Sequence, residues 1–338
     1  MAFTGKAATV LQQKGCPNAT TAHKLLYQAY PRPDGTFCFL PKDSIDYRVV
    51  VVDEISMLPK QMWRLLLSHG VYVLACGDPE QLPPIDKEAD NHVLDEPHVF
   101  LDEIMRQAQD SEIIRLSMWI REGKPLAQYQ GTNEQVQLFT REELVDGMYD
   151  WADQILCATN AQRNEINNFV RQRKGYGIEP CIGDKIISLH NHWDYSSITG
   201  TWALTNGSIG TIEYYEKNKI YIPSYISTSP ITYMITDIKL EDEDIFAGTP
   251  IDYKMLKLGE PTLTSKQSYQ LKRNKKIEAK PPYEFAYAYA ITTHKAQGSE
   301  WDKILIFEER FPFSEEEHRR WLYTAITRAR NKVVIIKK

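Results

Sequence analysis

The chain has 338 residues, of which 42% are hydrophobic, and a formal net charge of −5, so it can build two or three ordinary cores. It contains no apolar run near the roughly 20 residues of a membrane span and no signal peptide, so we expect a soluble cytoplasmic protein without a membrane partner. The charge excludes a generally basic coat, and the five scattered cysteines form no CxxC pair that would indicate a zinc site.

Two short helices and a hairpin are predicted at the start of the chain. Residues 4–15 show a helical pattern, and a second helix is expected to begin near Thr21. Prolines interrupt residues 27–46, where Asp34-Gly35 precedes an apolar run. Such a dipeptide is typical of a hairpin turn, so a small hairpin is predicted over this stretch.

Val49–Val52 is a run of four β-branched residues that ends at Asp53 and Glu54. The run suits a parallel strand buried on both faces, and the carboxyl end of such a strand is where open α/β sheets bind ligands. Two interpretations stay open. Acidic residues favour helix starts because of the helix dipole. Alternatively this is a Walker B element, in which Asp53 holds a Mg²⁺ ion bound to nucleotide phosphates and Glu54 orients or deprotonates the attacking water.

The next part of the chain alternates apolar runs with helical patterns. Strands are predicted at 71–76 and 155–158, a helix follows up to Gly175, and 113–150 is expected to be mostly helical. Alternation of this kind indicates parallel α/β layers.

From about residue 181 the pattern changes to short alternating segments, among them 209–215 and 219–222, separated by glycine and asparagine. This favours a β-barrel-like insertion that lasts to about residue 282. The α/β pattern then returns. Strands are predicted at 285–291, 303–307 and 333–336, and Ser314 with Glu317 forms a capping-box signature for a helix that lasts to about Arg330.

Seven stretches with polar, charged or glycine residues follow one another in a fixed order. They are residues 4–8, 21–23, 53–56, 77–84, 103–107, 292–300 and 322–330. The residues of these stretches and their order resemble the motifs of superfamily 1 helicases. The resemblance is closest to the RecD-like group, which moves 5′ to 3′ on single-stranded DNA. Each motif alone is weak, but chance does not explain seven in this order.

The resemblance implies an α/β fold with two RecA-like parallel-sheet P-loop NTPase domains and a small SH3-like β-barrel insertion in the second. The first domain is expected at 1–107, with the hairpin insertion at 27–46, and the second at 108–180 plus 283–338, interrupted by the insertion at 181–282. The implied function is an ATP-dependent DNA helicase or translocase that hydrolyses ATP in the cleft between the two domains. Its cofactors would be ATP and Mg²⁺, and its partners single-stranded DNA and duplex junctions.

The resemblance also implies an ATP site. Its catalytic residues would be Asp53, Glu54, Gln81, Arg106 and Arg328, with Asp53 as the metal ligand. The residues that contact ATP would be Gly77, Asp78, Gln81, Arg106, Gly298, Glu300 and Arg328. An arginine suits a phosphate contact because its planar fork stays charged and binds two oxygens. In the plainer alternatives Arg106 pairs with Glu103, Gly77-Asp78 is only a turn, and Arg330 is a charge at a helix C-terminus.

A second implied set lines a channel for single-stranded DNA. It consists of Thr4, Lys6, Thr21, His23, Thr293, His294 and Lys295. Hydroxyl groups and cations suit the phosphate backbone, and movement along any sequence needs no base-specific contact. Thr21 could instead cap a helix, His23 could be a core residue and Lys6 could be solvated. Aromatic residues in the tract 193–202 could stack on bases or simply pack.

The 338 residues contain no Gly-x-x-x-x-Gly-Lys-Ser/Thr stretch, whose backbone amides would cradle ATP phosphates. Gly5-Lys6 is no substitute, since Ala7 stands where the metal-binding hydroxyl is required. We therefore expect the P-loop on a missing N-terminal segment or a separate chain, as a result of truncation, a split gene or an internal start. The isolated chain should then hydrolyse ATP poorly or not at all, and its N-terminal domain should have low stability.

A different class of function is a nucleotide-independent DNA-binding or interaction module derived from a helicase. A P-loop sequence encoded upstream of Met1 would favour the motor, and its absence would favour the module. An unrelated phosphate-binding α/β enzyme would leave residues 293–295 and 327–328 unexplained.

Overall fold

The computed structural model describes residues 1–31, 37–84, 91–101, 111–131, 133–241, 243–273, 281–309 and 314–338. Contacts divide the chain into two compact units. Unit 1 consists of residues 1–11, 46–170 and 289–338, and unit 2 of residues 12–45 and 171–288. Each unit is therefore built from segments that are far apart in the sequence.

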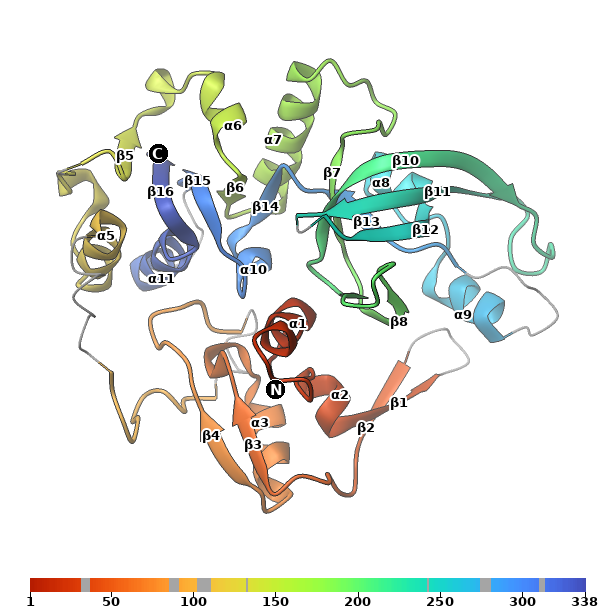
Figure 1. The fold of residues 1–338 in the computed structure, drawn as a ribbon, viewed down its shortest axis with the longest axis horizontal. Helices are drawn as coiled ribbons and strands as arrows, with labels where there is room; N and C mark the ends of the chain where they lie inside the picture. The colour runs from red at the N-terminus through yellow and green to blue at the C-terminus, as the bar shows by residue number, and fades with distance from the viewer. Residues whose placement is uncertain are drawn as a thin grey trace. The chain divides into compact units, whose positions relative to one another are not determined.

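The larger sheet of unit 1 has five parallel strands in the order β14-β6-β15-β16-β5 (Figure 1). Their bounds are Val136–Phe139 for β5, Gln154–Cys157 for β6, Ala290–Thr292 for β14, Trp301–Phe307 for β15 and Ala329–Ile336 for β16. Ile304, Leu305 and Ile306 of β15 are each 0% exposed. Continuous burial along a strand is what helices on both faces of a parallel sheet produce.

Helices cover both faces of this sheet. On one face α7 (Asn160–Arg173) packs Ile166 and Val170 against Ile155 and Phe307. On the other, α5 (Glu112–Arg121) and α11 (Glu315–Ile326) contact each other and β16, as Figure 1 shows. Unit 1 also contains the short helices α6 (Gly147–Trp151) and α10 (Thr293–Ala296).

The predicted capping box is confirmed. The Ser314 hydroxyl accepts a hydrogen bond from the Glu317 amide, and the Glu317 carboxylate accepts one from the Ser314 amide at 2.9 Å. The predicted end of this helix at Arg330 is wrong, because α11 stops at Ile326 and the chain enters β16 within three residues. The sheet, rather than helical propensity, decides the conformation of residues 329–336.

Two predictions about strands in this part of the chain are wrong. Residues 136–139, expected in a mostly helical region, form β5, because Val136 is buried and the segment pairs in parallel with β16. The strand expected at 285–291 is two strands. The chain leaves one sheet after Tyr287, where the Ala288 amide donates to the Lys185 carbonyl, and joins another at Ala290. A continuous apolar pattern could not show this change of sheet.

The smaller sheet of unit 1 consists of two parallel strands, β3 (Val49–Val52) and β4 (Tyr72–Ala75). Val50 and Val52 are buried, but Val49 is 59% and Val51 49% exposed. Their neighbours in register, Tyr72 and Leu74, are 76% and 59% exposed. The prediction that β3 is buried on both faces is therefore wrong, and we call these four side chains the open face.

The first residues of the chain run beside the end of β3. The Met1 amine donates to the Val51 carbonyl, and the Asp53 amide donates to the Met1 carbonyl at 2.9 Å. Helix α1 (Gly5–Gln13) follows, as predicted, and α3 (Lys60–Ser68) connects β3 to β4. These contacts fix the carboxyl end of β3, where the predicted catalytic carboxylates lie.

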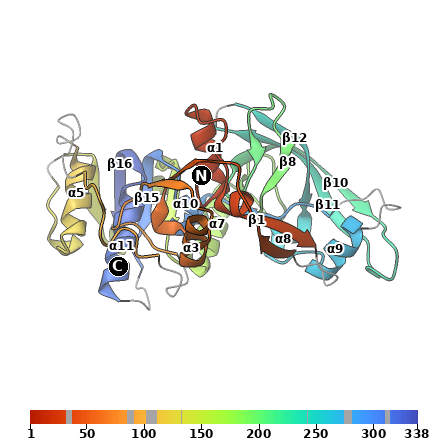
Figure 2. The same ribbon diagram turned by 90° about the horizontal axis from the view of Figure 1, so that it is seen from below.

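Unit 2 is dominated by a five-stranded antiparallel sheet in the order β12-β11-β10-β7-β13. The strands are β7 (Lys185–Ser188), β10 (Ile209–Ile220), β11 (Ile231–Leu240), β12 (Ile245–Asp252) and β13 (Phe285–Tyr287). Figure 2 shows β10 and β11 running together. The two strands predicted at 209–215 and 219–222 are one strand, whose register shifts between Ile212 and Tyr214. The sheet agrees with a β-rich insertion, while an SH3-like barrel remains a prediction.

The rest of unit 2 consists of small elements. Strands β8 (His192–Ser196) and β9 (Ala203–Leu204) pair, and the helices are α2 (Ala22–Leu26), α8 (Tyr253–Leu258) and α9 (Ser265–Arg273). The hairpin predicted over 27–46 is present as β1 (Tyr27–Pro31) and β2 (Phe37–Pro41), and its Asp34-Gly35 turn lies outside the described residues. Among the helices of the described ranges, none has the length and apolar composition needed to traverse a lipid bilayer.

Candidate functional site

Asp53 and Glu54 follow β3 directly. The backbone of Glu54 is left-handed, with φ 52° and ψ 50°, a conformation that costs a non-glycine residue about 1 kcal/mol or more and is often found at functional sites. Burial raises the pKa of the Glu54 carboxyl, Arg328 opposes that shift, and Asp53 and Asp78 add to it. The carboxyl of Glu54 thus binds a proton more tightly than an ordinary glutamate does.

A second loop, residues 77–82, follows the neighbouring strand β4. A Cβ atom at Gly77 would lie 2.8 Å from Cγ2 of Ile55, so only glycine permits this approach between the ends of β3 and β4. The Asp78 carboxylate accepts a hydrogen bond from the Glu80 amide at 3.0 Å, which makes the loop a tight turn. The plain-turn interpretation of Gly77-Asp78 is therefore correct as far as it goes, but Asp78 has a second contact.

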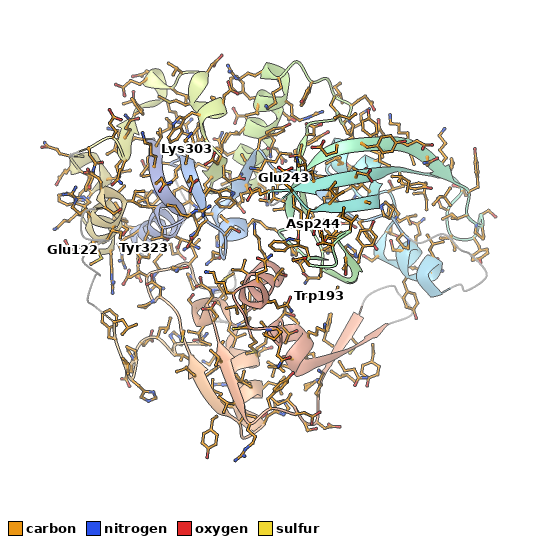
Figure 3. The ribbon with its side chains drawn as sticks, viewed as in Figure 1. Glu122, Trp193, Glu243, Asp244, Lys303 and Tyr323 are labelled. Atoms are coloured by element: carbon orange, nitrogen blue, oxygen red, sulfur yellow. The ribbon has the colours of Figure 1, made fainter. Side chains whose placement is uncertain are left out.

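That second contact joins loop 77–82 to α11. The Tyr323 hydroxyl, labelled in Figure 3, donates to the Asp78 carboxylate at 2.7 Å. The Leu82 amide donates to the Thr324 hydroxyl at 2.9 Å, and the Leu82 carbonyl accepts from Nε2 of Gln297 at 3.3 Å. Three motif stretches that are remote in sequence, 77–84, 292–300 and 322–330, therefore meet in unit 1.

Two buried glutamines lie at this junction. Gln81 is 9% and Gln297 2% exposed, and the Oε1 atom of each has no hydrogen-bond partner among the described residues. An unpaired buried polar atom costs about 1–3 kcal/mol, so such atoms call for a bound group or an ordered water. Gln81 is one of the predicted ATP contacts, and its unpaired oxygen suits a contact with the γ-phosphate or with the water that attacks it.

Arg328 is only 5% exposed and lies at the end of α11. Its Nε donates to the Thr324 carbonyl at 3.1 Å and its Nη2 to the Thr327 hydroxyl at 3.1 Å. Burial lowers the pKa of the guanidinium, and the negative charges of Glu54 and then Glu300 oppose that shift. The structure thus brings the predicted Arg328, Glu54 and Glu300 into one electrostatic environment.

Other predicted ATP-site residues are placed less directly. Arg106 and its alternative partner Glu103 lie outside the described residues. Gly298 has φ +76°, and a Cβ there would lie 3.2 Å from Cβ of Ala7, so glycine is required. Arg330 is not a helix C-terminal charge, since it belongs to β16 and forms an exposed ion pair with Asp302 at 3.3 Å.

No cluster of three or more metal-ligating side chains exists among the described residues. Mg²⁺ in nucleotide sites is typically bound by one or two carboxylates, water and the substrate's phosphate oxygens. A single carboxylate at the end of β3 therefore fits a Mg²⁺ ion that arrives with a nucleotide, and Asp53 is the residue in that position.

The predicted DNA contacts in unit 1 have local structural roles as well. The Thr4 hydroxyl accepts from the Ala7 amide at 3.2 Å and so caps α1, and Lys6 Nζ lies 5.6 Å from the ring centre of Trp301. Thr293 is fully buried and donates to the Cys157 carbonyl at 3.4 Å. Lys6 is therefore not simply solvated, and Thr293 is the member of the set least open to a ligand.

His294 and Lys295 lie partly buried on α10. Burial lowers the pKa of His294, which favours the neutral ring at pH 7. Burial, and then the nearby charge of Arg163, lowers the pKa of Lys295. Two cations close enough to repel each other form a local positive site, which an anion such as a phosphate would stabilise.

Thr21 and His23 belong to unit 2. Thr21 is buried, and its hydroxyl accepts from the Lys24 amide at 3.3 Å, so it caps α2 as the plainer alternative proposed. His23 is exposed, which rules out the alternative of a core histidine. The interpretation of the sequence did not name Tyr323, Thr324 or Gln297 as site residues. Their only signal is that they lie inside the same motif stretches as Arg328 and Gly298.

Comparisons with known proteins agree with this arrangement. A model described as an AAA domain matches residues 1–142, and one described as a UvrD-like helicase C-terminal domain matches residues 287–336. The ATP-dependent RecD2 DNA helicase of Deinococcus radiodurans is 25% identical over 357 residues, which cover 97% of this chain and 41% of the relative. The chain therefore spans less than half the length of this curated relative.

Solved structures give the same picture of the fold. One is a Pif1 helicase from Bacteroides in complex with ADP-AlF3 and single-stranded DNA, with a TM-score of 0.54 at 17% identity. The match covers 99% of this chain and 81% of the Pif1 chain. A Pif1 structure from work on unwinding of forked duplex DNA has a TM-score of 0.53 at 19% identity and covers 99% and 80%. They confirm the predicted α/β fold with two RecA-like domains.

Taken together, the matches confirm that the chain is related to superfamily 1 helicases. The curated relative reported above is a RecD2 DNA helicase, in agreement with the predicted resemblance to the RecD-like group.

Proposed function

We propose that this chain is the motor portion of an ATP-dependent DNA helicase that moves 5′ to 3′ along single-stranded DNA. One observation carries the proposal. Loop 77–82, whose Gln81 has an unpaired side-chain oxygen, is hydrogen-bonded to α11 and Gln297, and the pKa of Glu54, which follows β3, responds to the charge of Arg328. An ATP-driven motor needs carboxylates on one domain and a cation from another, and this junction supplies both.

Each residue at the junction has a defined role in this proposal. Asp53 holds the Mg²⁺ ion, which would neutralise charge on the ATP phosphates. Glu54 accepts a proton from the attacking water, and the raised pKa of its carboxyl makes the carboxylate a stronger base. Gln81 orients that water or senses the γ-phosphate. Arg328 stabilises the charge that develops on the transferred phosphoryl group.

The remaining predicted residues complete the nucleotide site and the DNA channel. Gly77, Asp78, Gly298 and Glu300 contact ATP in this proposal, and Arg106 is a second arginine finger. The channel is lined by Thr4, Lys6, Thr21, His23, Thr293, His294 and Lys295. The RecA-like domains correspond to 1–107 and to 108–180 plus 283–338, with the insertion at 181–282.

The phosphate cradle is the part that this sequence does not supply, because the 338 residues contain no P-loop stretch. We propose that a P-loop from another polypeptide segment, on the same or a separate chain, completes the ATP site. The chain by itself should then bind single-stranded DNA but hydrolyse ATP poorly. The same absence favours a second candidate function, a nucleotide-independent DNA-binding or interaction module.

The test measures binding of the purified chain to a fluorescein-labelled oligodeoxythymidylate by fluorescence anisotropy, with and without Mg-ATP, and ATP hydrolysis with and without DNA. Glu54→Gln and Arg328→Ala are measured beside the wild type. We expect salt-dependent DNA binding and hydrolysis near background. A DNA affinity that Mg-ATP shifts in the wild type, but not in Arg328→Ala, would support the motor.

Three outcomes would count against parts of the proposal. Absence of binding to single-stranded DNA would overturn a DNA motor and a DNA-binding module alike. Binding that Mg-ATP never changes would favour the module. Strong DNA-stimulated hydrolysis that Glu54→Gln abolishes would overturn the requirement for an external P-loop while keeping the motor.

A further inference from the structure

A lysine and a tryptophan from distant parts of the chain meet on unit 2. Lys24, exposed on α2, places its Nζ 5.2 Å from the centre of the Trp193 ring. Trp193 is a partly buried residue of β8, labelled in Figure 3. The ammonium group lies over the ring of Trp193, in the arrangement of a cation–π pair.

Two further rings, those of Tyr27 and Phe39, lie near His23, the residue before Lys24 in the sequence. His23, adjacent to Lys24, has its ring centre 6.1 Å from that of Phe39 on β2 and 6.1 Å from that of Tyr27. Phe39 is 50% exposed and His23 is also exposed. We call His23, Lys24, Phe39 and Trp193 the aromatic surface. It combines flat rings with a lysine and a titratable imidazole.

The backbone beneath the aromatic surface is held by specific contacts. His192, the residue before Trp193, stacks on Tyr283 with ring centres 3.7 Å apart and planes 22° from parallel. The Lys42 ammonium donates to the Lys24 carbonyl at 2.8 Å, which ties the end of the hairpin to α2. The backbone that carries Lys24 and Trp193 is therefore held in place, and preorganisation lowers the entropic cost of binding.

We propose that the aromatic surface binds the bases of single-stranded DNA, with Trp193 and Phe39 as stacking platforms and Lys24 as a phosphate contact. The proposal rests on the proposed function, because it extends a DNA channel that includes Thr21 and His23. Bases stack on aromatic side chains regardless of sequence, which suits a motor that must move along any strand. As a base approaches Trp193, Lys24 exchanges the ring for a phosphate oxygen.

The chain offers a matched control for this pair. In unit 1, Lys124 Nζ lies 4.9 Å from the ring centre of Trp119. Trp119 is fixed differently, because its Nε1 donates to the Pro125 carbonyl at 3.0 Å and its ring packs edge-on against Tyr129. The same chemistry therefore serves local packing there, and substitution at Trp119 should leave DNA binding unchanged.

The test compares affinities for labelled oligodeoxythymidylate among full-length variants at several salt concentrations. Trp193→Ala should weaken binding about tenfold, because one base loses its stacking partner, while Trp193→Phe keeps most of the affinity. Lys24→Ala should reduce the slope of log affinity against log salt by about 1, whereas Trp193→Phe should leave that slope unchanged. Trp119→Phe should match the wild type.

Intrinsic fluorescence gives a second measurement that does not depend on the stability of Trp193→Ala. DNA should quench tryptophan emission of the wild type, and Trp193→Phe should lose most of that quenching while Trp119→Phe keeps it. Quenching that persists in Trp193→Phe, or unchanged affinity in a folded Trp193→Ala, would overturn this inference and leave the proposed function intact. If the wild type binds no single-stranded DNA, both proposals fail.

Discussion

The two parallel sheets of unit 1 are built from similar residues, but they differ in how many of their faces are buried. In the five-stranded sheet, Ile304, Leu305 and Ile306 are inaccessible to solvent, whereas in β3 every second valine is about half exposed. Runs of β-branched and aliphatic residues form both. Parallel sheets normally have both faces covered, so the open face of β3 and β4 is the less common state.

The difference shows what an apolar strand sequence specifies. It specifies an extended segment that can be buried, and the rest of the fold determines whether one or both faces are buried. The predicted catalytic carboxylates, Asp53 and Glu54, follow a strand of the sheet with one exposed face, and the described residues attach its adjoining loop to α11 through Asp78 and Leu82. The candidate site therefore depends on contacts outside its own small sheet.

The largest expected effect is a loss of stability, which we compare for one leucine from each sheet. Leu305→Ala should destabilise the larger sheet by about 2–5 kcal/mol because it leaves a cavity at a fully buried position. Leu74→Ala, at a side chain that is 59% exposed, should cost less than about 1 kcal/mol. Hydrogen exchange of peptides from β15 and β4 measures both. Equal costs would show that another polypeptide covers the open face in solution.

A smaller contrast lies within β3 itself. Val52→Thr places a hydroxyl at a position that is 1% exposed and should cost about 1–3 kcal/mol, whereas Val51→Thr on the open face should be nearly neutral. The two substitutions are equal in shape and chemistry. Local exchange rates in β3 are the measurement, and a similar penalty at both positions would contradict the alternating burial.

The attachment of the small sheet is tested at Tyr323. Tyr323→Phe removes the hydrogen bond to the Asp78 carboxylate. The free energy needed to open loop 77–82 locally should therefore fall by about 1 kcal/mol. Amide exchange in that loop should accelerate, while exchange in β15 stays as in the wild type. Tyr221→Phe, at a tyrosine that is 80% exposed, is the matched control. An unchanged loop would mean that the Thr324 and Gln297 contacts suffice.

The smallest expected effect concerns Glu54. Because burial raises its pKa in the folded protein, the stability that Glu54 contributes is present below its ordinary pKa of 4.5 and is lost as pH rises through the raised value. The glutamine in Glu54→Gln does not ionise, so this variant loses no stability as pH rises through that value. Its melting temperature should therefore exceed that of the wild type at neutral pH. The gain should vanish below the ordinary pKa. A gain that is independent of pH would point to packing instead.

Much of the fold follows from local patterns in the sequence. The valine run, the Ser314 capping box and the alternation of strands and helices predicted β3, α11 and the parallel layers. The errors lie where distant partners decide the structure. Residues 136–139 form a strand only because β16 lies beside them, and residues 285–291 divide between two sheets. No local pattern reveals such partners.

The candidate site was partly predictable in the same sense. Motif order indicated Glu54, Gln81 and Arg328, and the structure brings their surroundings together. It did not indicate that Tyr323 and Thr324 would hold loop 77–82, because that contact depends on the relative rotation of α11. Nor could it show the left-handed backbone of Glu54 or the close approach of Gly77 to Ile55.

The interleaved order of segments in unit 1 has a consequence for synthesis. In the larger sheet, β16 lies between β15 and β5, and it follows the other four strands of that sheet in the sequence. On the ribosome β5 therefore waits without its strand partner until the rest of the sheet has been translated. Its unpaired edge is exposed during that interval, as in other nascent chains with long-range strand pairing.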